Sequence, residues 1–184
     1  LSFSAAAVPS KYEGLDLIPA NLNVYATVST LSNSIKRFFG FRQALDKAAL
    51  NTYDYILLDC PPTIEGALLT NALIITDYII IPVGVEDTYA LSGVSHLIKV
   101  AETLRADTES NLAIMGVLLT MYDGRTNLSL QVAEEVKRHF PGKVFATVIP
   151  RNVRLSEAPS HGKPANAYDG SSRGSVAYQR LTEE

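Results

Sequence analysis

The most informative stretch of the sequence is residues 53–62, YDYILLDCPP, where an apolar run ends in one carboxylate and is followed by two prolines. A run that is apolar throughout is typical of a strand buried on both faces of a parallel sheet. Asp59 ends this run, and ligands of α/β proteins bind at the carboxyl ends of the strands. The sequence therefore predicts a buried strand over residues 53–59 that presents the Asp59 carboxylate at a ligand-binding edge.

The rest of the chain alternates further apolar runs with segments of helical periodicity. The remaining strands are predicted at residues 15–18, 78–83, 114–120 and 144–149. Helices are predicted at residues 31–50, 64–76, 88–104, 128–140 and 176–184, and residues 150–164 are expected to form a polar, cationic loop. Apolar strands separated by helices indicate a parallel sheet that is covered on both faces. The predicted fold class is therefore α/β, with a doubly wound and mostly parallel sheet.

The composition predicts one globular domain over residues 1–184. With 47% hydrophobic and 19% charged residues, the chain can bury one core, and a second domain is not expected. A formal net charge of -3 excludes a protein wrapped in nucleic acid over its whole surface, although a local basic patch remains possible. The single cysteine, Cys60, excludes an internal disulfide framework and indicates the cytoplasm. The longest apolar stretch, residues 72–83, is interrupted by Asp77 and is too short to span a membrane.

Half of a nucleotide site is visible in the sequence. An aliphatic strand that ends in Asp is typical of the Walker B element of P-loop nucleotide hydrolases, where the carboxylate holds a magnesium ion or its water shell. The partner of this element is a glycine-rich loop, G-x-x-x-x-G-K-[ST], and the 184 residues contain no such stretch. The two Gly-Lys pairs, at residues 142–143 and 162–163, are followed by Val and Pro. Capping of the next turn remains the alternative role for Asp59.

Three separated stretches together resemble one family: residues 59–62 (DCPP), residues 118–128 (LLTMYDGRTNL) and residues 149–164. They are similar to the ParA/Soj chromosome and plasmid partitioning ATPases, members of the deviant Walker A group of P-loop NTPases, from about Gly14 to the end. The resemblance implies that the family's first strand, its K-G-G-x-G-K-T-T loop, a helix and a strand with the catalytic Asp lie upstream of Leu1. We therefore expect this chain to be the carboxyl-terminal two thirds of a ParA-type ATPase domain.

The resemblance also implies site residues, none of them catalytic. The expected positions are Asp59 at the metal, Pro61 and Pro62 in the loop that senses the γ-phosphate, Thr120 and Met121 beside the base, and Pro150 and Asn152 at the adenine. Arg125 and Arg154 match basic positions that contribute to sequence-independent DNA binding in the family. The alternatives are a turn residue for Asn152 and ordinary solvated cations for the two arginines.

The function implied by the resemblance is that of a partition ATPase. The intact protein is expected to bind ATP and Mg2+, form a nucleotide sandwich homodimer, bind DNA non-specifically and hydrolyse ATP when a ParB-type centromere-binding partner stimulates it. It is expected in the cytoplasm at the nucleoid, without a membrane partner, and the given chain alone is expected to be inactive. Two alternatives stay open: a MinD-like division-site ATPase and a non-enzymatic interaction module of a partition complex that lacks the P-loop. The MinD-like reading is disfavoured because no basic amphipathic segment follows Gly174.

Overall fold

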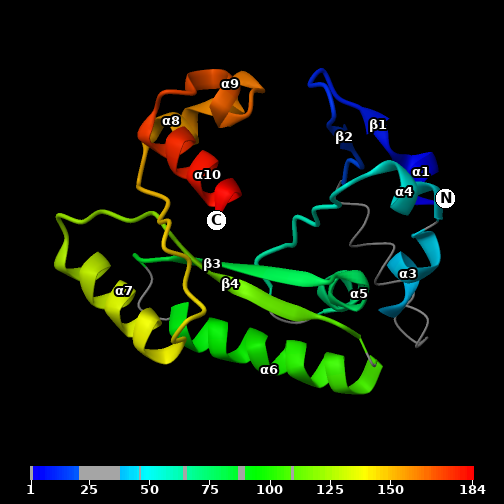
Figure 1. Ribbon diagram of the computed structural model, residues 1–184, viewed down its shortest axis with the longest axis horizontal. Helices are drawn as coiled ribbons and strands as arrows, with labels where there is room; N and C mark the ends of the chain where they lie inside the picture. The colour runs from blue at the N-terminus through cyan, green and yellow to red at the C-terminus, as the bar shows by residue number, and fades with distance from the viewer. Residues whose placement is uncertain (1, 21–37, 46, 64–65, 87–89, 109) are drawn as a thin grey trace. The chain divides into compact units, whose positions relative to one another are not determined.

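The computed structural model describes residues 2–20, 38–45, 47–63, 66–86, 90–108 and 110–184. The contacts divide the chain into two compact units, which are described one at a time. The first unit contains Leu1–Asp77 and Val100–Leu112, and the second unit contains Tyr78–Lys99 and Ala113–Glu184. Figure 1 shows the elements of both units in chain order.

The second unit is built on two parallel strands, β3 (Tyr78–Gly84) and β4 (Ala113–Thr120). The chain passes from β3 to β4 through the long helix α6 (Ala90–Thr108), as Figure 1 shows, and a parallel pair requires such a crossover. Helix α7 (Asn127–His139) follows β4. These elements confirm the predicted strands 78–83 and 114–120 and the predicted helix 128–140.

The core of the second unit lies between the parallel pair and the helices α6 and α7. Its innermost side chains are fully buried: Val85, Val117, Leu119 and Val136. Val94 and the partly buried Leu91, Leu97 and Ile98 of α6 pack against the same cluster. Alternate residues of β3 are buried and exposed, because only one face of this strand is covered within the part of the chain that the structure describes.

The predicted strand 144–149 is wrong as a regular strand, although this segment does pair with β4. Isolated bridges join Val117 to Val144 and Tyr122 to Pro150 at its two ends. Between them, the backbone N–H groups of Ala146 and Thr147 donate to the side-chain carboxylate of Glu184, at 2.7 and 3.0 Å. The segment therefore leaves the ladder in its middle because a side chain there replaces the strand as the hydrogen-bond partner.

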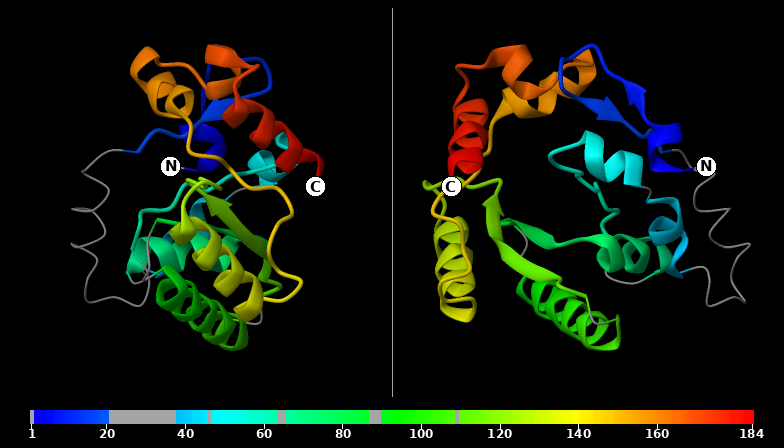
Figure 2. Two further views of the ribbon diagram at one scale, coloured as in Figure 1. Left: turned by 90° about the vertical axis from the view of Figure 1, so that its left-hand side faces the viewer. Right: turned by 45° about the vertical axis from the view of Figure 1, so that its right-hand side comes forward.

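Short helices follow this segment where a loop was expected. They are α8 (Val153–Glu157), the 3-10 helix η2 (Ala158–His161), α9 (Ala165–Asp169) and α10 (Arg173–Glu183). Figure 2 shows α8, α9 and α10 gathered in one group. A small apolar core of Leu118, Ile149 and Ala177 joins this group to the end of β4. The prediction of a loop over residues 150–164 is therefore wrong, whereas the predicted helix 176–184 is confirmed within α10.

Besides the carboxyl-terminal part of α6, the first unit consists of short elements. They are α1 (Phe3–Ala6), β1 (Val8–Pro9), β2 (Asp16–Leu17), α3 (Gly40–Ala44), α4 (Lys47–Thr52) and α5 (Ala67–Ile75). The predicted strand 15–18 contains β2, but β2 pairs with β1 in an antiparallel hairpin. The predicted helix 31–50 lies partly outside the described residues, and its described part forms the separate helices α3 and α4. Helix α5 confirms the prediction for residues 64–76 as far as that segment is described.

Two side chains hold the first unit together through long-range hydrogen bonds. The buried Asn71 accepts a bond from the backbone N–H of Phe41 at 3.0 Å, which ties α5 to α3. The hydroxyl of Tyr53 donates to Asp16 at 2.7 Å, and this bond ties the end of α4 to β2. The carboxylate at Asp16 raises the pKa of the Tyr53 phenol because it accepts the phenol's proton as a hydrogen bond.

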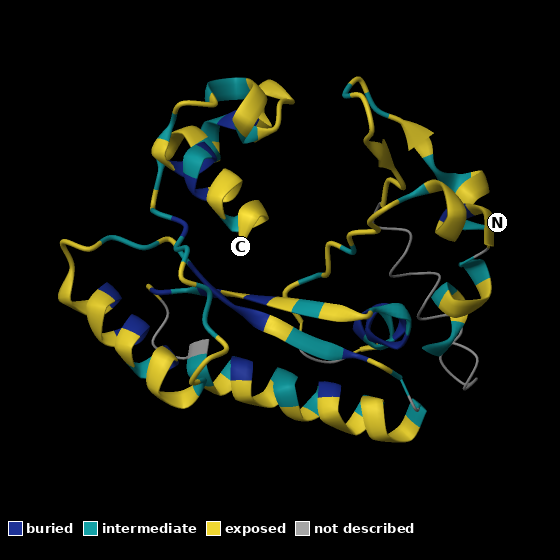
Figure 3. Cartoon of the chain, in the orientation of Figure 1, coloured by how far each residue is buried: buried dark blue, intermediate teal, exposed yellow. Residues whose placement is uncertain are grey.

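The predicted buried strand over residues 53–59 is not present. This segment is irregular, and the side chains of Tyr55 and Leu57 are 87% and 91% exposed. Figure 3 shows the exposed colouring of much of the stretch between α4 and α5. A buried strand requires neighbouring strands that satisfy its N–H and C=O groups, and no described strand pairs with residues 53–59.

Among the described helices, none has the length and apolar character that a membrane-spanning helix requires.

Candidate functional site

The loop after β4 and the segment around Pro150 form one connected edge in the second unit. The Tyr122 N–H donates to the carbonyl of Ile149 at 3.1 Å, and the Arg151 N–H donates to the carbonyl of Tyr122 at 3.0 Å. On the other side of β4, the Val85 N–H donates to the carbonyl of Thr120 at 3.1 Å. The carboxyl ends of three neighbouring segments therefore meet here, as expected for the ligand edge of an α/β sheet.

Four of the predicted site residues lie along this connected edge. Strand β4 ends at Thr120, and Met121 and Tyr122 follow it. Pro150 forms an isolated β-bridge with Tyr122. Asn152 comes two residues after Pro150 and begins helix α8. The structure therefore brings the four predicted nucleotide-binding residues to one edge.

Met121 has an unusual backbone. Its φ of 56° places it in the left-handed region, and it is the one non-glycine residue with positive φ among the residues that the structure describes. Such a conformation costs of order 1 kcal/mol for a side chain with a β-carbon, and strain of this kind clusters at binding sites. Met121 is also partly exposed, so its side chain is accessible at the edge.

Asn152 caps helix α8. Its side-chain oxygen accepts the backbone N–H of Arg154 at 2.8 Å, which is the bond that an N-cap residue makes. This geometry supports the turn-residue alternative for Asn152. It leaves the amide nitrogen, which carries two donor hydrogens, for an additional partner.

The predicted metal residue, Asp59, lies in the first unit with Pro61 and Pro62. Asp59 is exposed, and the Pro61 carbonyl accepts the N–H of Thr63 at 2.7 Å in a tight turn. Partial burial and the charge of Asp59 raise the pKa of the neighbouring Cys60 thiol. Within the described ranges, no group of three or more His, Cys, Asp and Glu side chains could hold a metal ion, so Asp59 is not part of such a cluster there. Asp59 belongs to the first unit, whereas Thr120, Met121, Pro150 and Asn152 belong to the second unit.

The two predicted DNA-binding arginines are both paired with carboxylates. Arg125 forms a fork with Asp123, with Nε to Oδ1 at 2.9 Å and Nη2 to Oδ2 at 2.7 Å. These bonds hold the pKa of Asp123 well below its usual range and raise the pKa of Arg125. Arg154 bonds to Glu157 at 2.8 Å and lies 3.4 Å from Asp169, and the bond to Glu157 raises its pKa.

Sequence reasoning missed these carboxylates. The spacings Asp123-x-Arg125 and Arg154-x-x-Glu157 are local, and the second is a helical i, i+3 pair that the sequence could have suggested. Asp169 has no such signal, because only the packing of α9 beside α8 brings it to Arg154. The hydroxyl of Tyr168 donates to Glu157 at 3.2 Å, and the ring of His161 stacks on Tyr168.

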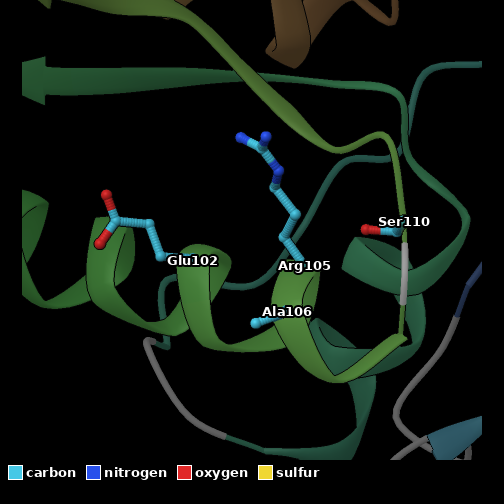
Figure 4. Close-up of a pocket in the computed structure, with 4 residues that line it drawn as sticks. All are labelled: Glu102, Arg105, Ala106 and Ser110. Atoms are coloured by element: carbon cyan, nitrogen blue, oxygen red, sulfur yellow. The ribbon is translucent and has the colours of Figure 1, made fainter.

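A separate shallow pocket lies in the first unit. It is lined by Glu102, Arg105 and Ala106 of α6 and by Ser110, as Figure 4 shows. The Ser110 hydroxyl is buried without a hydrogen-bond partner among the described residues. One acidic and one basic side chain on the same wall give the pocket no clear charge preference, so we assign it no ligand.

Parallel strands with a helical crossover and polar loops at the strand ends define an α/β protein, and its similarity to known proteins assigns it to the P-loop NTPase class, as the sequence predicted. A family model described as an AAA domain matches residues 2–114. The sporulation initiation inhibitor protein Soj of Bacillus subtilis is 49% identical over 172 residues, which cover 94% of this chain and 67% of Soj. The chromosome partitioning protein ParA of Caulobacter vibrioides strain NA1000 / CB15N is 43% identical over 180 residues, which cover 97% of this chain and 67% of ParA. The chain belongs to the ParA/Soj family of chromosome-partitioning ATPases.

A solved structure shows the same fold. Cobyrinic acid a,c-diamide synthase from Mycobacterium smegmatis, with bound ATP analog and magnesium, superposes with a TM-score of 0.80 at 29% identity. The match covers 100% of this chain and 66% of the synthase chain. The chain thus spans about two thirds of the length of the relatives that it matches.

Proposed function

We propose that the protein carrying this chain is a partition ATPase that binds ATP with Mg2+, and that the edge formed by Thr120, Met121, Pro150 and Asn152 binds the adenine base. The observation that carries the proposal is the hydrogen-bonded connection of Tyr122 with Ile149 and Arg151, which holds these four residues together. Family membership supports the choice of nucleotide, since the related synthase structure contains an ATP analog and magnesium.

Each residue of this edge has a chemical role in the proposal. The carbonyl of Pro150 accepts a hydrogen bond from the base, and the amide nitrogen of Asn152 donates one, which leaves the Asn152 oxygen on its helix cap. Thr120 and the partly exposed Met121 cover the base from the β4 side. A polar site of this kind discriminates between bases because the wrong base leaves a buried donor or acceptor without a partner.

We assign the phosphate side to the residues that the family resemblance implies for it. Asp59 would hold the magnesium ion or its water shell, and Pro61 and Pro62 would fix the loop that faces the γ-phosphate. Bound ATP supplies the phosphoanhydride bond that is hydrolysed with water. The residues present fit this role in part, because Asp59 offers an exposed carboxylate but belongs to no cluster of three or more His, Cys, Asp or Glu side chains among the described residues.

The further steps of the cycle are also part of the proposal. We place non-specific DNA binding on Arg125 and Arg154 of an ATP-bound homodimer, with hydrolysis stimulated by a ParB-type partner at the nucleoid in the cytoplasm. Contacts to phosphates require only cations along a backbone, so an acidic protein can make them locally. The names of the relatives, chromosome partitioning protein ParA and Soj, support this assignment over a division-site role.

The 184 residues alone are proposed not to hydrolyse ATP, because they contain no loop lysine for the phosphates. Magnesium-dependent phosphate release from this chain above the rate of a heat-denatured sample would contradict this point. A module without enzymatic activity is the second candidate. The two candidates are distinguished by ATP binding and turnover in the full-length protein.

The adenine site is tested with a variant that spares the helix cap. Asn152→Ser keeps a side-chain oxygen for the Arg154 N–H but removes the amide donor, whereas Asn166→Ser is a matched change on the exposed face of α9. In the full-length protein, we expect Asn152→Ser to weaken binding of a fluorescent ATP analogue about tenfold, the effect of one lost hydrogen bond of about 1.4 kcal/mol. We expect Asn166→Ser to bind like the wild type. Equal affinities of all three proteins would overturn the proposed role of Asn152.

A further inference from the structure

The fork between Asp123 and Arg125 occupies the part of the arginine that would bind a phosphate. Asp123 accepts three hydrogen bonds from this one residue, from the backbone N–H at 3.1 Å, from Nε at 2.9 Å and from Nη2 at 2.7 Å. The Arg125 side chain is 89% exposed, whereas that of Asp123 is 21% exposed. The Asp123 carboxylate is therefore held against one side of the Arg125 guanidinium, which is otherwise accessible.

A second charged pair lies beside the fork. The guanidinium of Arg151 bonds to Glu86 at 3.0 Å, and its charge also acts on Asp123, whose pKa it helps to lower. The connection of Tyr122 with Arg151 holds the two pairs on the same edge. The four charges alternate in sign, so the edge has little net charge in the absence of a bound anion.

We infer that Asp123 is the counter-ion that competes with phosphate groups for Arg125, and that it thereby limits how tightly this surface binds a nucleic acid backbone. The inference rests on the proposed function of Arg125 in DNA binding and adds a residue that sets the strength of that binding. Asp123 is a positioning residue in this account, since it acts through Arg125 and touches no ligand itself.

The competition follows from the geometry of the guanidinium. Carboxylate and phosphate both use the Nε and Nη donors of arginine as a planar fork. A phosphate that takes this fork must displace Asp123, and a phosphate that binds the outer edge is still repelled by the carboxylate. Either way, removal of the carboxylate charge should strengthen binding and increase its dependence on salt.

Protonation does not release the arginine near neutral pH. The bonds from Arg125 hold the pKa of Asp123 well below its usual range, so the carboxylate remains ionised in any buffer in which DNA binding is measured. Competition by another anion is then the way to free the guanidinium. Phosphate groups of a nucleic acid are such anions at high local density.

The test measures binding of the full-length protein, with saturating ATP and Mg2+, to a fluorescent DNA duplex of random sequence over a range of salt concentrations. Asp123→Asn removes the charge and keeps the shape. Glu135→Gln removes the same charge from α7, where Glu135 pairs with Arg138, and controls for the change in net charge. Arg125→Ala tests whether the arginine takes part at all.

We expect Asp123→Asn to tighten binding about threefold to tenfold at 0.1 M salt, and to steepen the slope of log K against log salt by up to about 1, the effect of one further neutralised phosphate. Glu135→Gln should match the wild type. Unchanged or weaker binding of Asp123→Asn, with Arg125→Ala clearly weakened, overturns the inference but leaves DNA binding by Arg125 intact. Wild-type affinity of Arg125→Ala overturns both.

Discussion

Leu155 of α8 packs directly against Gly174 of α10, so closely that a β-carbon on Gly174 would lie 2.5 Å from the Cγ atom of Leu155. This contact closes the small core that holds the helices after Ile149 to the end of β4. Because Asn152 begins α8, the same contact fixes the helix that follows the proposed adenine edge.

Gly174→Ala should therefore destabilise the protein. The added methyl group would force apart two packed helices, and overpacking of this kind costs about 1–3 kcal/mol. Gly84→Ala is the matched control, since a β-carbon on Gly84 would meet no atom within 4 Å. Urea denaturation of the full-length protein measures the difference, and equal midpoints for the two variants would show that the contact is not tight in solution.

The carboxylate of Glu184 should contribute stability that depends on pH. Its bonds from the N–H groups of Ala146 and Thr147 lower its pKa in the folded state. A lowered folded pKa means that the contribution is present above the unfolded pKa and is lost as the pH falls through the folded pKa.

Glu184→Gln should therefore lower the urea midpoint at pH 7, and the difference from wild type should shrink in acid. Glu183→Gln provides the control, because Glu183 is the exposed neighbouring residue at the end of α10. A difference that stays constant between neutral and acidic pH would show that the charge of Glu184 plays no part.

The two methionines offer a direct test of backbone strain. Met121 has a φ of 56°, whereas Met115 lies within strand β4. A β-branched residue tolerates the left-handed region poorly, so Met121→Val should cost about 1–2 kcal/mol of stability. Met115→Val should be close to neutral because valine suits a strand. Thermal unfolding of both variants measures this, and a neutral Met121→Val would mean that the turn is not left-handed in solution.

Asn71 should be important for the stability of the first unit. Its side chain is 3% exposed, and the N–H of Phe41 depends on its oxygen. Asn71→Ala leaves that donor without its partner, at a cost of about 1–3 kcal/mol. Asn51→Ala, on the exposed side of α4, should change stability by less than about 0.5 kcal/mol. Equal effects of the two variants in urea denaturation would contradict the role of this bond.

The fold could be predicted from sequence wherever local pattern and tertiary pairing agree. Strand β3, strand β4 and helix α7 have clear periodicity and lie in one core, so their expected and observed bounds differ by a residue or so. Residues 53–59 have an equally clear apolar pattern but no described pairing strand, and here the pattern alone gave the wrong structure. Hydrophobic periodicity shows which face of a segment could be buried. It does not show whether a neighbouring strand is present to pair with that segment.

The placement of four candidate residues along one edge could be predicted, whereas their side-chain contacts could not. Thr120, Met121, Pro150 and Asn152 were identified by resemblance, and the structure places them along one edge. The pairing of Arg125 with Asp123 and the capping role of Asn152 depend on side-chain geometry, which spacing suggests only for close neighbours. Asp169 comes close to Arg154 because their helices pack together, and no local sequence pattern predicts such a contact.

The central claim is that the edge between Thr120 and Asn152 binds adenine. Photo-crosslinking of the full-length protein with 8-azido-ATP and Mg2+, followed by mass spectrometry of the labelled peptides, tests this claim most directly. We expect labels on residues 120–122 or 150–152 that disappear when excess ATP competes. Competable labels confined to other parts of the chain would contradict it.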